Sequence, residues 1–73
     1  MGDFLFIYTN HALHKMDARG ITREEVEKII RMGMKWKEPT TEKWHALASG
    51  VEVVFMKDKS TFYIITAYLA VRS

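Results

Sequence analysis

The last part of the chain carries three strand-like runs joined by very short connections, and this arrangement constrains the fold more than any other feature. The runs are Trp44–Ala48, Val51–Lys57 and Thr61–Val71, and the turns between them read SG and KDKS. Parallel neighbours need a crossover of about a dozen residues or more, whereas antiparallel neighbours are joined by tight turns. The sequence therefore predicts an antiparallel meander.

The residues of these runs are distributed over the two faces of the predicted sheet. Within Val51–Lys57 the odd-numbered residues, which are mostly apolar, share one face, and the even-numbered residues share the other. The run Thr61–Val71 is apolar on both faces, which is typical of a strand inside a sheet.

The first half of the chain predicts one strand and two helices. Phe4–Tyr8 is an apolar and aromatic run of the kind that forms strands. A helix over Asn10–Ala18 follows, and Gly20 stands where a left-handed residue ends a helix. The sequence TREE at 22–25 is a capping box, which begins a second helix that reaches about Met32.

Lys35–Lys43 is the loosest segment, where Pro39 and neighbouring threonines indicate a loop that can begin with a short strand at Lys35–Lys37. The predicted order is strand, helix, helix and three strands, in one α+β domain over residues 1–73. Two helices would pack on one face of a small antiparallel sheet. The other face would be solvated, used for binding or paired with another chain.

Length and composition narrow the class of protein. The chain has 73 residues, no cysteine and a formal net charge of +2. This length suits one domain, and the lack of cysteine excludes disulfides and thiolate metal sites. The mild positive charge permits nucleic-acid binding without requiring it. No apolar run reaches the length of a membrane span and the start does not resemble a signal peptide, so we expect a cytoplasmic protein that does not bind membranes.

The first predicted helix carries a row of basic side chains. His11, Lys15 and Arg19 are spaced by four residues, so they lie on one side of the helix, beside an apolar face with Ala12 and Met16. The row is either the solvated side of an ordinary helix or an anion-binding ridge with a titratable group. As a ridge it combines an imidazole that transfers protons near neutral pH with two phosphate-binding cations, the groups that metal-free RNA cleavage needs.

Other kinds of site have less support in the sequence. His11, His14 and His45 do not match a zinc-binding pattern, so no metal site is predicted. The chain has no glycine-rich phosphate loop, no GxSxG motif and no cysteine nucleophile, and no cofactor is predicted. Trp36 and Trp44 are able to stack on nucleic-acid bases, although such residues more often belong to a core or an interface.

Two stretches of the chain resemble one protein family. The first is T-x-H-A-x-x-K-M-x-x-R-G-I-T over 9–22, followed by the capped helix, and the second is Ile-Thr-Ala-Tyr at 65–68 in the last strand. They resemble domain-of-unknown-function family 4258, and the resemblance covers nearly the whole chain. Lys15 stands where that family usually has arginine, and lysine lacks the bidentate phosphate contact of arginine.

That family in turn resembles the small RNase toxins of the RelE and BrnT type. The resemblance implies a RelE-like fold, RNA cleavage without a metal, and a site where the first helix meets the sheet. In that site His11, Lys15 and Arg19 would face Thr66 and Tyr68. His11 would act as general acid or base, Lys15 and Arg19 would hold the scissile phosphate, and Thr66 and Tyr68 would orient the substrate or assist proton transfer.

Strand geometry and aromatic character add Lys57, His45 and Trp44 as candidate RNA-binding residues. The leading hypothesis is a metal-independent endoribonuclease of the toxin–antitoxin type, with RNA as its ligand and a cognate antitoxin as its protein partner. The alternative hypothesis is a non-catalytic module that binds nucleic acid or protein. A third is an accessory protein that forms a homodimer through its aromatic strands.

Overall fold

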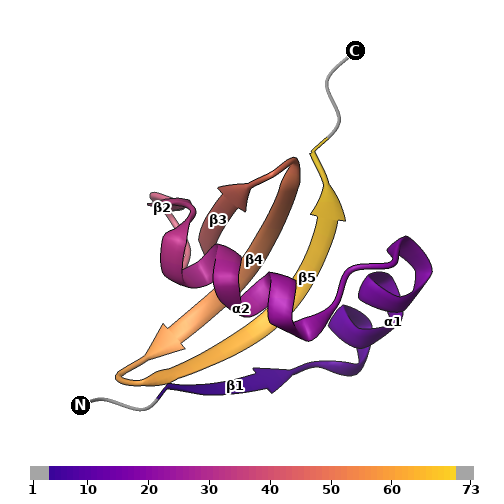
Figure 1. Ribbon diagram of the computed structural model, residues 1–73. Coiled ribbons are helices and arrows are strands. Elements are labelled where there is room, and N and C mark those ends of the chain that lie inside the picture. Colours follow the sequence, from indigo (N-terminus) through magenta and orange to yellow (C-terminus); the bar gives the residue numbers. More distant parts are fainter. Residues whose placement is uncertain (1–3, 71–73) are drawn as a thin grey trace.

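The computed structural model describes residues 4–70, which form two helices and a five-stranded sheet (Figure 1). In chain order the elements are β1 (Leu5–Tyr8), α1 (Asn10–Arg19), α2 (Arg23–Met32), β2 (Met34–Lys37), β3 (Trp44–Ala48), β4 (Val51–Asp58) and β5 (Thr61–Leu69). The predicted α+β class is confirmed, and β2 adds one strand to the three expected after the helices. Val71, which was assigned to the last strand, lies outside the described residues.

The strands are arranged in the order β1-β5-β4-β3-β2 across the sheet. Strands β2 to β5 form the expected antiparallel meander, in which each strand pairs with the next one in the chain. The sheet is mixed, because β1 pairs with β5 in parallel. The chain passes through both helices and three strands between β1 and β5, so no tight turn forces that pair to be antiparallel.

Local sequence signals set the ends of both helices. Thr9 caps α1 by accepting a hydrogen bond from the Ala12 backbone N–H at 3.0 Å, and Gly20 ends the helix in the left-handed conformation with φ of 69°. The predicted capping box of α2 is present, with Thr22 and Glu25 bonded in both directions at 3.1 and 2.8 Å.

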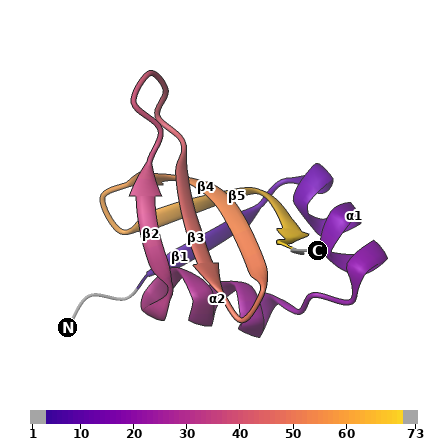
Figure 2. The same ribbon diagram turned by 90° about the horizontal axis from the view of Figure 1, so that it is seen from above.

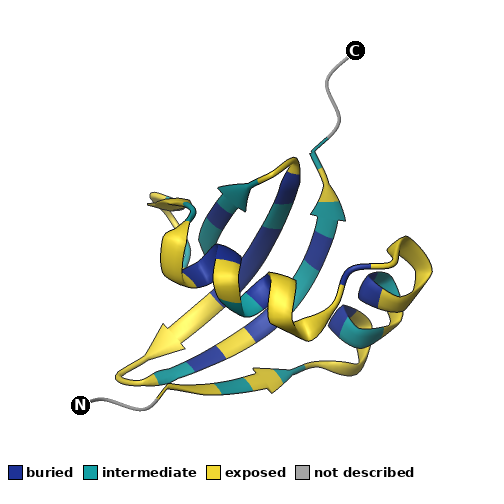
Figure 3. Ribbon diagram, in the orientation of Figure 1, coloured by how far each residue is buried: buried dark blue, intermediate teal, exposed yellow. Residues whose placement is uncertain are grey.

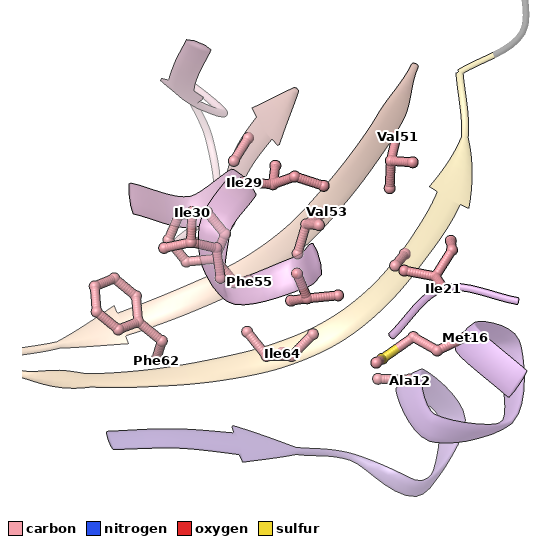
Figure 4. Packing of buried hydrophobic residues seen from close by; sticks show 13 residues of the cluster. Ala12, Met16, Ile21, Ile29, Ile30, Val51, Val53, Phe55, Phe62 and Ile64 are labelled. Atoms are coloured by element: carbon pink, nitrogen blue, oxygen red, sulfur yellow. The ribbon is translucent and has the colours of Figure 1, made fainter. Parts of the chain in front are cut away.

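Both helices contribute to one hydrophobic core on one side of the sheet. Helix α2 crosses β3 and β4, and α1 packs along β5 (Figures 1 and 2). Buried positions mostly alternate with less buried ones along β5, whereas β4 is buried at three consecutive positions, 53–55, and exposed at its last three (Figure 3). Figure 4 shows the side chains that meet between the layers, including Ala12 and Met16 of α1, Ile29 and Ile30 of α2, and Val53, Phe55 and Ile64 of the sheet. No helix among residues 4–70 is long and apolar enough to cross a membrane.

A β-bulge in β5 determines which side chains reach the opposite face of the sheet. Thr66 pairs with Val54 while Ile64 pairs with Phe55, so Ile65 is the extra residue of β5. Because side chains alternate along a strand, this bulge turns Thr66 and Tyr68 away from the core. No helix of the described chain covers that face, which we call the open face, and Figure 2 shows the β2–β3 hairpin projecting from the sheet away from α2.

Candidate active site

The register of the sheet brings a group of polar side chains together on the open face. Glu52 of β4 pairs across the strands with Tyr68 of β5, and His45 of β3 lies diagonally next to Glu52. The loop after β2 adds Glu38. We call these four residues the His45 cluster. They come from three strands and one loop, so the fold, and no single stretch of sequence, assembles them.

Short hydrogen bonds connect the His45 cluster into one chain. The Tyr68 hydroxyl donates to Glu52 Oε2 at 2.6 Å, and the same oxygen lies 2.6 Å from His45 Nδ1. His45 Nε2 lies 2.6 Å from Glu38 Oε2, while the other Glu38 oxygen accepts a hydrogen bond from the Thr41 hydroxyl at 2.8 Å. Both ring nitrogens of His45 therefore contact carboxylates.

The pKa values of His45 and Glu38 both move in the direction that favours their charged forms. Burial by itself lowers the pKa of His45, but the hydrogen bonds to Glu38 and Glu52 outweigh it and raise the pKa above its ordinary value. The hydrogen bond to His45, helped by the one to Thr41, lowers the pKa of Glu38. The hydrogen bond to Glu52, together with burial, raises the pKa of Tyr68 to about 12, so its hydroxyl stays protonated.

The cluster is within reach of solvent. The His45 side chain is 14% exposed, and the Glu38 side chain, which covers one ring nitrogen, is 32% exposed. Trp36 of β2 stacks on the His45 ring, with ring centroids 5.1 Å apart and planes inclined by 5°. Trp36 keeps its other side accessible, since the residue is 38% exposed. An indole beside a charged imidazole gives a ligand both a stacking surface and a proton donor.

A comparison with known protein families shows which family the chain belongs to. The family described as "Domain of unknown function (DUF4258)" matches residues 8–69. The chain belongs to this family. The DUF4258 match includes α1, the whole meander and every residue of the His45 cluster. A search of curated proteins found no match.

Three of the residues predicted from the sequence lie on the open face of this DUF4258 protein. Tyr68 and His45 belong to the His45 cluster and share Glu52 as their hydrogen-bond partner. Thr66 occupies the same cross-strand row as Val54 and His45, so Thr66 and His45 are two strands apart. Two strand spacings correspond to about 10 Å, a separation that an RNA segment can bridge.

The three predicted residues of α1 lie on a helix that packs along β5, whose second half has no strand partner on the β1 side within residues 4–70. Thr9, just before α1, donates from its backbone N–H to the Ile64 carbonyl at 3.2 Å and from its hydroxyl to the Ile65 carbonyl at 3.2 Å. The helix that carries His11, Lys15 and Arg19 therefore starts beside the bulge that precedes Thr66. His11 and Arg19 are exposed and Lys15 is partly buried.

Direct contacts do not link this basic row to the open face. Among residues 4–70, His11, Lys15 and Arg19 make no side-chain hydrogen bond or ion pair with Thr66 or Tyr68. The described part of the chain also has no group of three His, Asp or Glu side chains arranged to hold a metal ion.

The other two predicted residues lie on the helix side of the sheet. Lys57 pairs with Phe62, and Trp44 pairs with Phe55, and all four line a pocket at the end of α2. Lys57 and Trp44 are thus separated from the His45 cluster by the thickness of the sheet. They belong to a different surface from the one that holds His45.

Sequence reasoning missed the two carboxylates that hold His45. The sequence offered a hint of a role for Glu52, because it is a lone acid within the apolar run of β4 and faces away from the core. The sequence offered no such hint for Glu38, since it lies in a loop whose path depends on the β2–β3 pairing. Trp36 was considered only as a possible base-stacking residue, and its place against His45 follows from their direct pairing across β2 and β3.

Proposed function

We propose that this DUF4258 protein is a metal-independent endoribonuclease of the toxin–antitoxin type, similar to the RelE and BrnT toxins, and that RNA binds across its open face. One observation carries the proposal: a solvent-accessible imidazole, raised in pKa, is held by a carboxylate on one nitrogen and covered by a partly exposed carboxylate on the other. A carboxylate-oriented imidazole is a recurring arrangement in acid–base catalysis.

The reaction needs one proton acceptor and one proton donor. The 2′-hydroxyl of a ribose loses its proton to a base and attacks the adjacent phosphorus, which forms a 2′,3′-cyclic phosphate. The bond from phosphorus to the 5′-oxygen breaks, and that oxygen takes a proton from an acid. His45 is the proposed acid–base group: its neutral form would take the 2′-hydroxyl proton, and its protonated form, which the raised pKa favours, would give a proton to the 5′-oxygen, while His11 at the start of α1 would bind the RNA backbone.

For His45 to donate, Glu38 has to move away from Nε2. Glu38 lies in the loop between β2 and β3 and its side chain is 32% exposed, so a rotation toward solvent is sterically open. Glu52 remains bonded to Nδ1 and keeps the ring oriented, because its side chain is only 15% exposed and also holds Tyr68. In this proposal Glu38 acts as a cover over the proton donor and Glu52 as a positioning residue.

The basic row of α1 and the remaining polar and aromatic side chains of the open face would bind the substrate. Lys15 and Arg19 extend the site beyond β5 with two positive charges for the RNA backbone, which carries one negative charge per nucleotide. Thr66 lies between that row and His45 and offers a hydroxyl to the scissile nucleotide. Trp36 would stack on a base next to His45. A cognate antitoxin that covers the open face would block all of these contacts.

The test is RNA cleavage by purified protein in EDTA, with the fold of each variant checked by thermal unfolding. We expect His45→Gln and Glu52→Ala to lose activity, and Glu38→Ala to match or exceed the wild type because it uncovers Nε2. His11→Ala should lower the activity while His14→Ala, on the same helix and also exposed, keeps it. Equal activity of His45→Gln and wild type would refute the proposal.

A non-catalytic binding module is the second candidate, and the apolar part of the open face favours it. Ile7, Tyr63 and Met56 lie in one row across β1, β5 and β4, and all three are exposed, at 41%, 39% and 39%. Such a row suits a protein partner or a second copy of the chain. Binding of RNA or of a second copy, without cleavage by the wild type under any of these conditions, would select this candidate.

A further inference from the structure

A pocket on the helix side of the sheet lies outside the site described above. It has a volume of about 530 Å³ and lies beside the last turn of α2, over the end of β4 and the start of β5. Its floor is aromatic, with Trp44, Phe55 and Phe62, and Phe4 and Ile30 complete the apolar lining. Figure 4 shows Phe62 beyond the part of the sheet that α2 covers. The pocket faces away from the His45 cluster, so it does not depend on the proposed ribonuclease site.

Three cations surround this aromatic floor. Arg31 of α2, Lys35 of β2 and Lys57 of β4 line the pocket, and no acidic side chain among residues 4–70 does. None of the three forms an ion pair with any carboxylate of residues 4–70. Lys57 places its ammonium 6.0 Å from the centre of the Phe62 ring, at the margin of the aromatic floor. Lys35 donates a hydrogen bond to the Gly33 carbonyl at 3.1 Å and keeps its charge, so the positive charge of the three side chains is available to a ligand.

The side chains that line the pocket determine which kind of ligand fits it. Apolar and aromatic side chains provide the floor, and the polar groups of the lining are cations. A nucleobase placed there would leave the hydrogen-bonding groups of its edge largely unpaired, which is costly in an apolar pocket. A bulky apolar side chain has no such groups, and carboxylates next to it would meet the three cations at the rim.

We propose that this pocket binds a peptide segment of a partner protein in which bulky apolar side chains are flanked by carboxylates. The apolar side chains would fill the hollow over Trp44, Phe55 and Phe62. The flanking carboxylates would pair with Arg31, Lys35 and Lys57. A volume of about 530 Å³ is within the ordinary range for ligand pockets and accommodates two large side chains.

The two tryptophans allow a direct test, because one lies at the pocket and the other on the open face. The chain has two tryptophans, so Trp36→Phe leaves Trp44 as the sole fluorescent indole. The probe is the synthetic peptide acetyl-EELFEE-amide. The matched peptides are acetyl-KKLFKK-amide, which reverses the charge, and acetyl-EEAAEE-amide, which lacks the apolar side chains. A single-stranded RNA hexamer is the fourth ligand.

We expect the EELFEE peptide to change the Trp44 fluorescence saturably and the two matched peptides to bind at least about tenfold more weakly. Lys57→Glu and Lys35→Glu should each weaken EELFEE binding by about tenfold, and Lys28→Glu, an exposed lysine of α2 outside the pocket, should change it less than about twofold. All three variants change a lysine on the surface, and thermal unfolding of each variant is the check that the fold is kept.

Three results would overturn the proposal. The first is no saturable response of Trp44 to the EELFEE peptide. The second is equal binding of the KKLFKK peptide, or equal binding by Lys57→Glu and the parent protein. The third is tighter binding of the RNA hexamer than of the peptide with the same sensitivity to Lys57→Glu, which would assign the pocket to nucleic acid.

Discussion

Removing the Glu52 carboxylate tests whether the His45 cluster forms and how strongly it is held. In Glu52→Ala two hydrogen bonds of 2.6 Å lose their acceptor, one from Tyr68 and one from His45. Hydrogen bonds to charged groups contribute about 1.5–3 kcal/mol each, so the largest cost would be about 6 kcal/mol. His45 is 14% exposed and can recover water, which reduces the expected loss to about 2 kcal/mol. For a domain of this size that loss lowers Tm by about 8–16 °C.

The assay is thermal unfolding followed by circular dichroism at about pH 6 and about pH 9. Glu42→Ala is the control, since Glu42 is an exposed carboxylate of the same loop region as Glu38, and a surface change of this kind costs less than about 0.5 kcal/mol. The cost of Glu52→Ala should be smaller at the higher pH, because a neutral His45 makes a weaker bond to the carboxylate. An equal Tm for Glu52→Ala and Glu42→Ala at both pH values would refute the cluster as described.

Three further predictions concern His45, Gly33 and Thr66. The pKa of His45 is raised on folding, so protonated His45 stabilises the folded protein fully below about pH 6.5, and this stabilisation is lost as pH rises through the folded pKa. The wild-type Tm should therefore fall over that pH window, and the Tm of His45→Gln should not. Gly33→Ala places a Cβ 2.6 Å from the Ile29 carbonyl oxygen and 2.8 Å from that of Leu47, and should destabilise the protein by about 2 kcal/mol or more in denaturant unfolding. Thr66→Val keeps the β-branched shape and should keep Tm while lowering the rate of RNA cleavage by about tenfold, and an unchanged rate would exclude Thr66 from the site.

Local signals predicted most of the fold. The capping box at Thr22, the glycine stop at Gly20 and the tight turns of the meander each act over a few residues, so they can be read directly from the sequence. The parallel pairing of β1 with β5 joins segments that are more than fifty residues apart, as in the pair Leu5 and Thr61. Such a pairing is decided by the packing of the whole domain, and no local pattern reports it.

The open face shows where alternation in the sequence misleads. In an unbroken strand Ile64, Thr66 and Tyr68 would share one face, and Ile64 is fully buried in the core. The bulge at Ile65 reverses the alternation of side chains between the two faces and places Thr66 and Tyr68 on the open face. His45 was a candidate from the sequence, but its carboxylate partners were not, because Glu38 and Glu52 reach it through the loop conformation and a diagonal contact between strands.

The most direct test of the proposed function uses the chemistry of the RNA ends. Wild-type protein is incubated in EDTA with an RNA oligonucleotide, and with the same oligonucleotide carrying a single 2′-deoxy nucleotide at the cleaved position. Attack by the 2′-hydroxyl predicts cleavage of the RNA into 2′,3′-cyclic phosphate and 5′-hydroxyl ends, no cleavage at the deoxy position, and no activity for His45→Gln. Cleavage at the deoxy position, or intact RNA after incubation with folded wild-type protein, would contradict a ribonuclease built on the His45 cluster.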